Sequence, residues 1–492
     1  MNARLTARKP APTGRRHDAG MLKQAIPILP DRHIPPEPVL RRIDGPGPRY
    51  TSYPTADRFA AGFAPERLGV LLDEHRQACD RGEHPPLSIY VHIPFCESLC
   101  YYCACNKIIT KHHERAGPYL DALEREIELV VARMGTGRAI SQLHFGGGSP
   151  TFLSDAEIAR LMASLGRAFR FAADAELSIE VDPRTVTAER LAFLRGQGFN
   201  RISFGVQDFD ADVQRAVHRV QPYESVCEIM RAARECGFES INADLIYGLP
   251  LQTAQSFART IEQIIELRPD RIALYAYAHL PSRFKPQRRI AAADLPAASQ
   301  RVDMLALAMA RFMERGYDYI GMDHFALPDD ALAIARREGR LQRNFQGYST
   351  HPDCELLGFG VSAIGRIRDS YYQNAKTLPE YYEALEQGRL PVVRGIELVP
   401  DDLQRRDVIM ALMCHGRVAF ADIDARHPGR MREDFAPELA ALAPFVADGF
   451  VELHEDGVQV TPQGWFVVRA VAMVFDRYLR DGASRERFSK VV

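Results

Sequence analysis

A regular alternation of apolar strands and amphipathic helices, beginning near residue 87, constrains the fold more than any other feature of the sequence. Short runs rich in β-branched and aromatic residues alternate with longer segments whose apolar residues recur at helical spacing. The expected strands are 87–95, 141–148, 176–182, 201–207, 240–248, 271–278 and 317–325. The expected helices are 117–134, 154–170, 188–198, 223–237, 254–268 and 298–316. Seven strands that are each followed by a helix predict parallel pairing through right-handed crossovers.

Polar residues recur at the C-terminal ends of most of these strands, and this favours a partial (β/α) TIM-like barrel. Active sites of such barrels assemble at that end, from several strands at once. Open doubly wound sheets also bind ligands at strand C-termini, so they remain the alternative. The fold class is therefore predicted to be α/β.

The alternation weakens after about residue 326. Helices are expected at 331–339, 378–388 and 402–414, followed by a hairpin around Asp456-Gly457 and a terminal helix to about residue 479. This layout resembles a winged helix, but a structural cap is the favoured interpretation. We predict four parts: a disordered N-terminal extension (1–40), an N-terminal segment that contributes to the substrate site (41–86), the barrel (87–326), and a mostly helical C-terminal cap domain with a small hairpin (327–492).

Charge and hydropathy exclude several classes of partner. Lys and Arg number 62 against 64 Asp and Glu, so the net charge of −2 gives no sign of nucleic-acid binding. No stretch approaches the roughly 18 apolar residues of a membrane span. The Arg-rich N-terminus lacks the apolar core of a secretory signal. A transit peptide is conceivable, but the prolines of the N-terminus favour a disordered tail. A cytoplasmic location is expected.

Four of the nine cysteines fall within ten residues, directly after the first expected strand. Cys96, Cys100 and Cys103 form a C-x3-C-x2-C pattern, and Cys105 follows. Such a cluster, in a chain without an export signal, points to metal or redox chemistry. Three thiolates can hold three corners of a [4Fe–4S] cluster and leave the fourth iron open. The alternative is a structural zinc site with Cys105 as fourth ligand, although its usual spacing is wider.

A glycine-rich segment, 146–151 (GGGSPT), follows the second expected strand. Glycine tolerates unusual φ and close approach, so the backbone amides of this segment can reach the charged end of a ligand. Strand ends often carry glycine, and it is the place of this segment, one β/α unit after the cysteines, that makes it informative here.

Together, the cysteine pattern and this segment resemble the radical S-adenosylmethionine (SAM) enzymes. Further segments resemble the oxygen-independent coproporphyrinogen III dehydrogenase (oxidase) family, from about Arg49 to Val492. They include RYTSYPTA (49–56), SIEVDPR (178–184), GVQDF (205–209), DLIYGLP (244–250), NFQGYST (344–350) and LLGFGVSAIG (356–365).

The resemblance implies a radical SAM oxidoreductase of haem biosynthesis. Two propionates of coproporphyrinogen III would become vinyls, giving protoporphyrinogen IX, through 5′-deoxyadenosyl radicals made from SAM. The resemblance assigns the [4Fe–4S] cluster to Cys96, Cys100 and Cys103 and implies two SAM molecules. Cluster-bound SAM would contact Tyr90, Gly147, Glu180 and Ile364. The second SAM would contact Tyr102, Gly148, Ser149, Gln207, Arg219, Asp244 and Ala278.

The remaining expectations concern catalysis and partners. Tyr90, Cys105 and Gln346 are the candidate catalytic residues, with Phe345 shielding the site; a passive thiol at Cys105 and a structural Gln346 remain alternatives. The four propionates of the substrate predict a basic pocket, for which the candidates are Arg41, Arg42, Arg49 and Arg343. A flavodoxin or ferredoxin type protein is the expected electron donor of a monomer that binds no nucleic acid or membrane.

A haem-carrying chaperone of the same lineage is a rival reading. Such relatives usually lack the fourth cysteine, RYTSYPTA and NFQGY, all of which occur here.

Overall fold

The computed structural model describes Val39, residues 45–351 and residues 353–479. Most of the predicted N-terminal extension, together with the candidate residues Arg41 and Arg42, lies outside the described residues. No helix in the described part of the chain combines the length and apolar character needed to cross a membrane.

A 12-stranded sheet forms the centre of the molecule. Its strands, in order across the sheet, are β16 (Val392–Glu397), β15 (Ser370–Asn374), β14 (Ile364–Ile367), β13 (Glu355–Phe359), β1 (Leu87–Ile93), β4 (Arg138–Gly147), β5 (Phe169–Val181), β6 (Arg201–Gln207), β7 (Ser240–Tyr247), β8 (Arg271–Ala276), β10 (His324–Ala326) and β9 (Asp318–Gly321). The run from β13 to β8 is parallel throughout. Among the described strands, β16 and β9 are the outermost strands of this sheet and do not pair with each other, so it is an open, partial barrel, as predicted.

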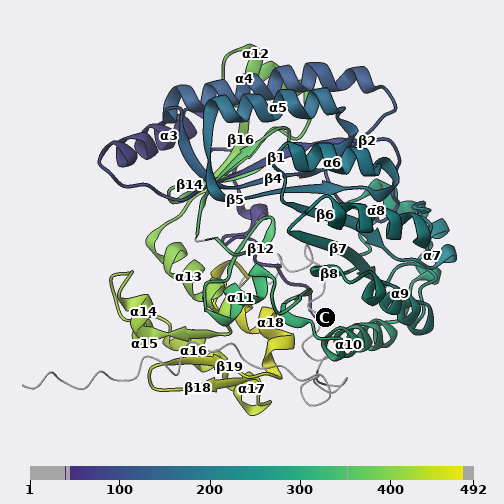
Figure 1. Cartoon of the computed structure of the whole chain (residues 1–492). Coiled ribbons are helices and arrows are strands. Elements are labelled where there is room, and N and C mark those ends of the chain that lie inside the picture. The colour runs from purple at the N-terminus through teal and green to yellow at the C-terminus, as the bar shows by residue number, and fades with distance from the viewer. Residues whose placement is uncertain (1–38, 40–44, 352, 480–492) are drawn as a thin grey trace, which may run out of the picture.

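Helices cover the outer face of the curved sheet, and the elements that follow residue 400 lie on its inner side (Figure 1). The C-terminal helix α12 (Leu378–Glu386) lies on the outer side, beside α4. The covering helices are α3 (Pro65–Asp80), α4 (Ala116–Met134), α5 (Asp155–Ala168), α6 (Ala188–Gly196), α8 (Tyr223–Glu235), α9 (Ala254–Leu267) and α10 (Ala298–Glu314). Fully buried side chains such as Ile127, Leu161 and Ile261 form the core between these helices and the sheet. A short helix that was not predicted, α7 (Ala211–Ala216), precedes α8.

The last predicted strand, 317–325, is wrong as a single parallel strand. The chain reverses at Gly321 and Met322, whose φ values are +141° and +52°. β9 and β10 are therefore two short antiparallel strands, and β10 pairs antiparallel with β8. The parallel series ends at β8.

The other edge of the sheet also departs from the expectation, because β13 to β16 were not predicted as strands. β13 pairs parallel with β1, and β14, β15 and β16 continue the sheet antiparallel. These strands come from the segment expected to be a mostly helical cap. Every residue of β13 and β15 is buried, so neither strand shows an alternation of apolar and polar residues.

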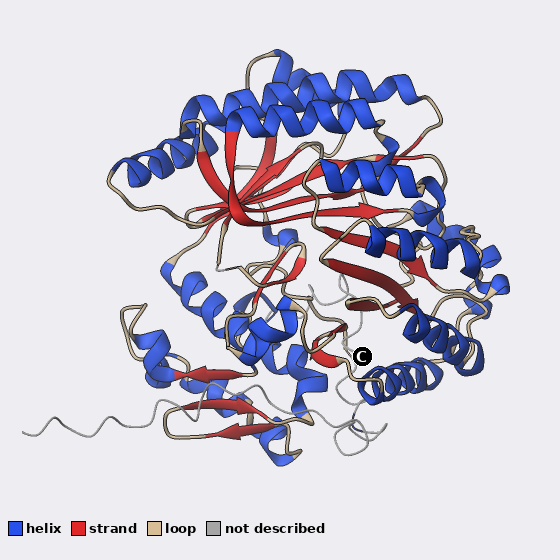
Figure 2. Cartoon of the chain, viewed as in Figure 1, coloured by secondary structure: helices blue, strands red, loops and turns tan. Residues whose placement is uncertain are grey.

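The C-terminal part contains the expected helices and hairpin. The helices are α11 (Ala331–Arg337), α12 (Leu378–Glu386) and α13 (Pro400–His415). The hairpin of β18 (Val451–Leu453) and β19 (Gly457–Val460) pairs with β17 (Arg417–Ala419) to form a three-stranded sheet (Figure 2). The expected terminal helix is broken: α18 (Val468–Met473) is followed by a short 3-10 turn at Arg477–Leu479.

The N-terminal segment is fastened to the C-terminal end of the described chain. The buried Tyr50 hydroxyl donates to Asp476 Oδ2 at 3.0 Å, and the Tyr53 ring lies 6.0 Å from that of Tyr478. Arg469 Nε donates to the Pro48 carbonyl at 2.8 Å. The segment therefore belongs to the packed structure and lies against the C-terminal elements.

Candidate active site

The cysteine loop follows β1 and is closed at its base by backbone hydrogen bonds. β2 (Phe95–Cys96) pairs with β3 (Ile108–Ile109), and Thr110 N donates to the Cys96 carbonyl at 2.9 Å. Within this closed loop Cys100 is buried, Cys96 and Cys103 are half-buried, and Cys105 is exposed. The loop holds the three predicted ligands on one short stretch of fixed backbone.

Cations surround these thiols. Arg219 Nη1 lies 3.5 Å from Cys100 Sγ and 3.1 Å from Asp182 Oδ2. Arg184 Nη2 lies 3.9 Å from the same sulfur, and Lys107 Nζ donates to the Cys103 carbonyl at 3.0 Å. Positive charge favours the thiolate form, which is the form that binds metal.

The thiols are also close enough to affect one another's pKa. Burial raises the pKa of Cys96 to about 12, and charge on Cys103 and Cys100 acts in the same direction. The hydrogen bond with Cys105 lowers the pKa of Cys103 to about 6. In the part of the chain that the structure describes, no three His, Cys, Asp or Glu side chains surround one point as ligands of a single ion. An iron–sulfur cluster instead needs one thiolate at each of several irons. The three thiols of Cys96, Cys100 and Cys103 fit that requirement.

The predicted glycine turn packs directly on the cysteine loop. Gly147 has a φ of +115°, and a Cβ there would lie 2.7 Å from the His92 ring. A Cβ on Gly148 would lie 2.7 Å from the Pro94 and Phe95 carbonyl oxygens. Ser149 N donates to the Phe95 carbonyl at 2.8 Å. Only glycine fits at positions 147 and 148, and the turn brings its backbone against the cysteine loop.

Tyr90 and Glu180 meet at this turn through two histidines that the sequence analysis missed. The Tyr90 ring stacks on His144 at 5.9 Å, and its hydroxyl lies 3.1 Å from His92 Nδ1. Glu180 Oε1 lies 3.2 Å from His144 Nε2, and Gly147 N donates to Glu180 Oε2 at 3.2 Å. Burial alone would raise the pKa of Glu180, but His144 and the Gly147 amide hold it below its usual value. Glu180 is therefore an ionised carboxylate beside the turn.

Asp244, Gln207 and Arg219 form a second group around β6 and β7. Gln207 is the last residue of β6, Arg219 follows α7, and Asp244 lies within β7, not at its end as was expected. Ser203 Oγ donates to Asp244 Oδ2 at 3.0 Å, and burial followed by the charge of Glu180 raises the pKa of Asp244 to about 6. Gln207 ends β6 with a φ of +68°. Arg219 Nη2 donates to the Gly205 carbonyl at 2.7 Å, whereas its buried Nε has no hydrogen-bond partner among the described residues. The sequence analysis also missed Asp182, which accepts a hydrogen bond from Arg219 Nη1.

Tyr102 and Ala278 are joined by a third residue that the sequence analysis missed, Gln287. Its side chain is buried, and Nε2 donates to the Tyr102 carbonyl at 3.0 Å and to the Ala278 carbonyl at 3.1 Å. Leu280 N donates to its Oε1 at 2.6 Å. Gln287 lies in a 3-10 helix of five residues, Lys285–Arg289, which is too short for a periodic pattern to single it out.

Gln346 and Phe345 lie in the turn between β11 (Gln342–Asn344) and β12 (Gly347–Ser349). Gln346 Nε2 is buried and has no hydrogen-bond partner among the described residues. The Phe345 ring meets Tyr371 edge-on at 5.9 Å, and Ile364 packs in the same apolar cluster. The turn therefore presents one unsatisfied amide next to an apolar wall.

Arg49 and Arg343 are adjacent, as a basic pocket requires. Arg343 Nε donates to the Arg49 carbonyl at 3.3 Å, and its guanidinium lies 4.6 Å from the centre of the Tyr348 ring. Arg49 pairs with Asp323. Burial, and then the charges of Arg343 and Arg49, lower the pKa of His324 well below its usual value. Arg343 Nη1 and His324 Nδ1 are buried without hydrogen-bond partners in the described chain.

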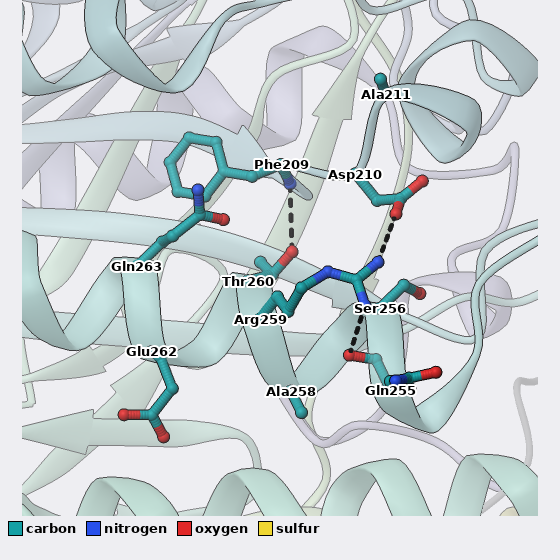
Figure 3. A pocket seen from close by; sticks show the side chains of 10 residues that line it. All are labelled: Phe209, Asp210, Ala211, Gln255, Ser256, Ala258, Arg259, Thr260, Glu262 and Gln263. Atoms are coloured by element: carbon teal, nitrogen blue, oxygen red, sulfur yellow. Dashed lines mark hydrogen bonds and ion pairs between the residues drawn. The ribbon is translucent and has the colours of Figure 1, made fainter.

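A surface hollow of about 660 Å³ lies elsewhere, between α7 and α9 (Figure 3). It is lined by residues including Phe209, Asp210 and Arg259, and Arg259 Nη2 donates to Asp210 Oδ2 at 3.1 Å. None of the predicted site residues lines it. The candidate site is instead the inner, C-terminal end of the parallel strands.

Comparison with known families defines the class of protein. Residues 90–264 match the family model of the Radical SAM superfamily, which spans the cysteine loop, the glycine turn and most of the parallel strands. Residues 398–467 match the HemN C-terminal domain. The fold and the cysteine loop are thus those of a radical SAM enzyme.

Individual relatives narrow the class. The oxygen-independent coproporphyrinogen III oxidase of Escherichia coli strain K12 is 49% identical over 454 residues, which cover 92% of this chain and 98% of that protein. The protein of the same name from Pseudomonas aeruginosa is 48% identical over 457 residues, with the same coverage of both chains. The solved structure of coproporphyrinogen III oxidase (HemN) from E. coli, a radical SAM enzyme, matches with a TM-score of 0.86 and 48% identity over 91% of this chain and all of that one. The chain belongs to the family of oxygen-independent coproporphyrinogen III oxidases.

Proposed function

We propose that this protein oxidatively decarboxylates two propionates of coproporphyrinogen III to vinyl groups, giving protoporphyrinogen IX, without oxygen. The observation that carries the proposal is the packing of the three-cysteine loop on the glycine turn at the C-terminal end of a parallel barrel, in a chain of this family. The propionate carbon to be attacked has no acidic proton, so general acid–base residues alone cannot activate it.

Cys96, Cys100 and Cys103 would hold a [4Fe–4S] cluster, and SAM would bind its open iron. When bound, these groups supply a carbon-centred radical that can take hydrogen from an unactivated C–H bond. The protein's own contribution is to bind, orient and shield. Cys100 is buried and the other two ligands are half-buried, so the glycine turn and the barrel strands would shield the reacting groups from one side.

Two sets of residues would bind the two SAM molecules. Tyr90, Gly147, Glu180 and Ile364 would contact the cluster-bound molecule, where ionised Glu180 can accept hydrogen bonds from its cationic amino group or ribose hydroxyls. Tyr102, Gly148, Ser149, Gln207, Arg219, Asp244 and Ala278 would contact the second. The free Nε of Arg219 is the position from which that side chain would donate to a carboxylate.

The substrate would lie between the barrel and the β11–β12 turn. Arg49 and Arg343 would pair with propionates, because Arg343 Nη1 is a buried donor still lacking a partner among the described residues. Gln346 would donate its unsatisfied amide to substrate, and Phe345 would exclude water. Cys105, exposed next to the cluster ligands, would act on the substrate side of the site.

We also propose the setting of the reaction. All nine cysteines are free thiols, which supports a reducing compartment such as the cytoplasm. The protein would act as a monomer and receive electrons from a flavodoxin or ferredoxin type protein. The division into N-terminal segment (41–86), barrel (87–326) and C-terminal cap (327–492) is kept as a functional division, with four strands of the last part completing the sheet.

The test is an anaerobic assay of the reconstituted protein with coproporphyrinogen III, SAM and dithionite. We expect protoporphyrinogen IX, detected by fluorescence after oxidation, with 5′-deoxyadenosine as co-product. Cleavage of SAM without any change in the porphyrinogen would refute the assigned substrate. Absence of both products would refute the assigned chemistry.

A further inference from the structure

A basic surface segment, residues 283–289, lies beside the cysteine loop and has no role in the proposed chemistry. Its sequence, RFKPQRR, contains four exposed cations, Arg283, Lys285, Arg288 and Arg289, and no acid. Within the described chain, Lys285, Arg288 and Arg289 form no ion pair with a carboxylate. Such a concentration of uncompensated charge is unusual in a chain whose net charge is only −2.

The segment is fastened to the cysteine loop by contacts already described and by Tyr101. Buried Gln287, inside the segment, donates to the carbonyl of Tyr102, the residue before Cys103. Arg289 Nη1 donates to the Tyr101 hydroxyl at 3.2 Å, and its guanidinium lies 5.2 Å from the centre of that ring. A molecule bound on this segment would therefore be one residue layer from a predicted cluster ligand.

Apolar groups are exposed next to the same loop. The Tyr101 ring stacks on His218 at 5.1 Å, and His218 Nδ1 lies 2.9 Å from the Leu99 carbonyl. Val220, two residues further on, is 59% exposed. An exposed apolar group beside a cationic segment is the composition of a small, charge-steered protein interface.

We propose that residues 283–289, with Tyr101 and Val220, are the docking surface for an acidic one-electron donor protein of the flavodoxin class. The proposal rests on the proposed function. In the step that it serves, one electron leaves the anionic flavin hydroquinone of the donor, which becomes the neutral semiquinone, and enters the oxidised cluster. No bond forms or breaks between the two proteins. The exposed cations of the segment would attract an acidic donor protein. Electron transfer would favour this part of the surface, because Gln287 contacts Tyr102, the residue before Cys103.

The direct test measures binding of a bacterial flavodoxin to the anaerobic holoenzyme by calorimetry at low and high salt. The test variant is Lys285→Glu/Arg288→Glu. The matched control is Arg167→Glu/Arg170→Glu, which changes the net charge equally but alters two exposed arginines where α5 joins the amino end of β5, at the opposite end of the barrel. We expect the test variant to weaken flavodoxin binding about tenfold or more at low salt, because opposed charges at an interface are costly. The control should change it much less, and high salt should reduce the difference.

A second measurement separates this proposal from the proposed function. Dithionite needs no docking surface, so 5′-deoxyadenosine formed with dithionite reports on the cluster and SAM alone. Failure of the wild-type protein in that assay would refute the proposed function, whereas the binding measurement would still judge the docking surface. Equal loss of flavodoxin affinity in the test and control variants would overturn the docking proposal. Unchanged affinity together with a raised KM for coproporphyrinogen would overturn it too, by assigning the segment to the substrate.

The milder variant Lys285→Gln/Arg288→Gln guards against misfolding. Its iron content and circular dichroism should equal those of the wild type, with an intermediate loss of flavodoxin affinity. Full affinity in this variant, with the charge-reversal variant misfolded, would count against the docking surface.

Discussion

At Gly147, where the glycine turn packs against β1, there is no room for even one additional side-chain atom. At Gly147 the backbone is in a left-handed conformation, and a methyl group would press on the His92 ring. His92 Nδ1 lies 3.1 Å from the Tyr90 hydroxyl, and His92 Nε2 lies 2.9 Å from the Asn106 carbonyl oxygen. A change of one atom at this position therefore reaches the predicted SAM contacts.

The first prediction concerns Gly147→Ala. The substitution should lower the free energy of unfolding by about 1–3 kcal/mol through backbone strain and weaken SAM binding by displacing His92. Thermal unfolding and equilibrium dialysis with SAM check the two effects. Gly166→Ala, in helix α5 with open space around its Cβ, is the matched control and should leave both unchanged or slightly raise stability. Normal SAM affinity in Gly147→Ala would contradict the assigned role.

The second prediction separates the four clustered cysteines. Cys96→Ser, Cys100→Ser and Cys103→Ser should each lose bound iron, because each removes one ligand of the cluster. Cys105→Ser should keep most of its iron and lose turnover. Iron analysis and visible absorption after anaerobic reconstitution check this, with Cys227→Ser on α8 as control. Four variants with equal iron content would disprove the ligand assignment.

At this scale the site residues were assigned from the resemblance to the family, and sequence reasoning missed the residues that support them. Glu180 lies one residue before the end of β5, as expected of a strand-end carboxylate, whereas Asp244 lies within β7. His92 and His144 carry no signal as lone histidines, although they lie on the same inward face as Tyr90 and Glu180. Gln287 depends on a contact 185 residues away in the sequence, which no local pattern encodes.

At the scale of elements, α4 is tied to the sheet through one buried carboxyl group. Glu126 accepts hydrogen bonds from Tyr381 Oη on α12, Asn374 Nδ2 at the end of β15 and Gly360 N after β13, at 2.6, 2.6 and 2.8 Å. Burial raises the pKa of Glu126 to about 7. One side chain thus connects α4 with β13, β15 and α12.

The third prediction is a pH dependence of stability that comes from Glu126. Its pKa is higher in the folded than in the unfolded protein, so the folded state retains a proton that the unfolded state has lost. Stability should therefore fall as the pH rises from about 4.5 to about 7, by about 3 kcal/mol at most for this group. Comparing Glu126→Gln with wild type by denaturation across this range checks it. The variant should lack that part of the fall, while Glu128→Gln, at an exposed position on the same helix, should retain it. Identical slopes in all three proteins would contradict the assignment.

The strands and helices could be predicted where apolar strands alternate regularly with amphipathic helices. The parallel strands β1 and β4 to β8 alternate with helices, so periodicity located them, although β5 begins at Phe169, inside the expected helix 154–170. Gly321 and Met322 reverse the chain within a run that reads as one strand. β13 and β15 are too buried to show a period, and β14 has only four residues. Their places in the sheet depend on pairing with distant strands.

At the scale of the whole molecule, the two ends of the described chain pack against each other. Tyr50 and Asp476 are 426 positions apart and share a buried hydrogen bond. Burial raises the pKa of Asp476, while the bond from Tyr50 opposes that rise. No local sequence pattern predicts such a contact.

The fourth prediction is that Tyr50→Phe lowers the free energy of unfolding by about 1–2 kcal/mol, because it leaves the buried Asp476 carboxyl without this donor. Denaturant unfolding measures the change. Tyr382→Phe, which removes a hydroxyl from a half-buried ring, should cost much less. An equal effect of the two substitutions would argue against a special role for the Tyr50 contact.

The account as a whole requires an iron of the cluster that has no protein thiolate and is open to SAM. The most direct measurement is the electron paramagnetic resonance spectrum of the reduced, reconstituted protein before and after SAM is added without oxygen. We predict that SAM changes the shape and g-values of the signal, because its amino and carboxylate groups bind the open iron. A [4Fe–4S] signal that stays the same at saturating SAM would contradict the account.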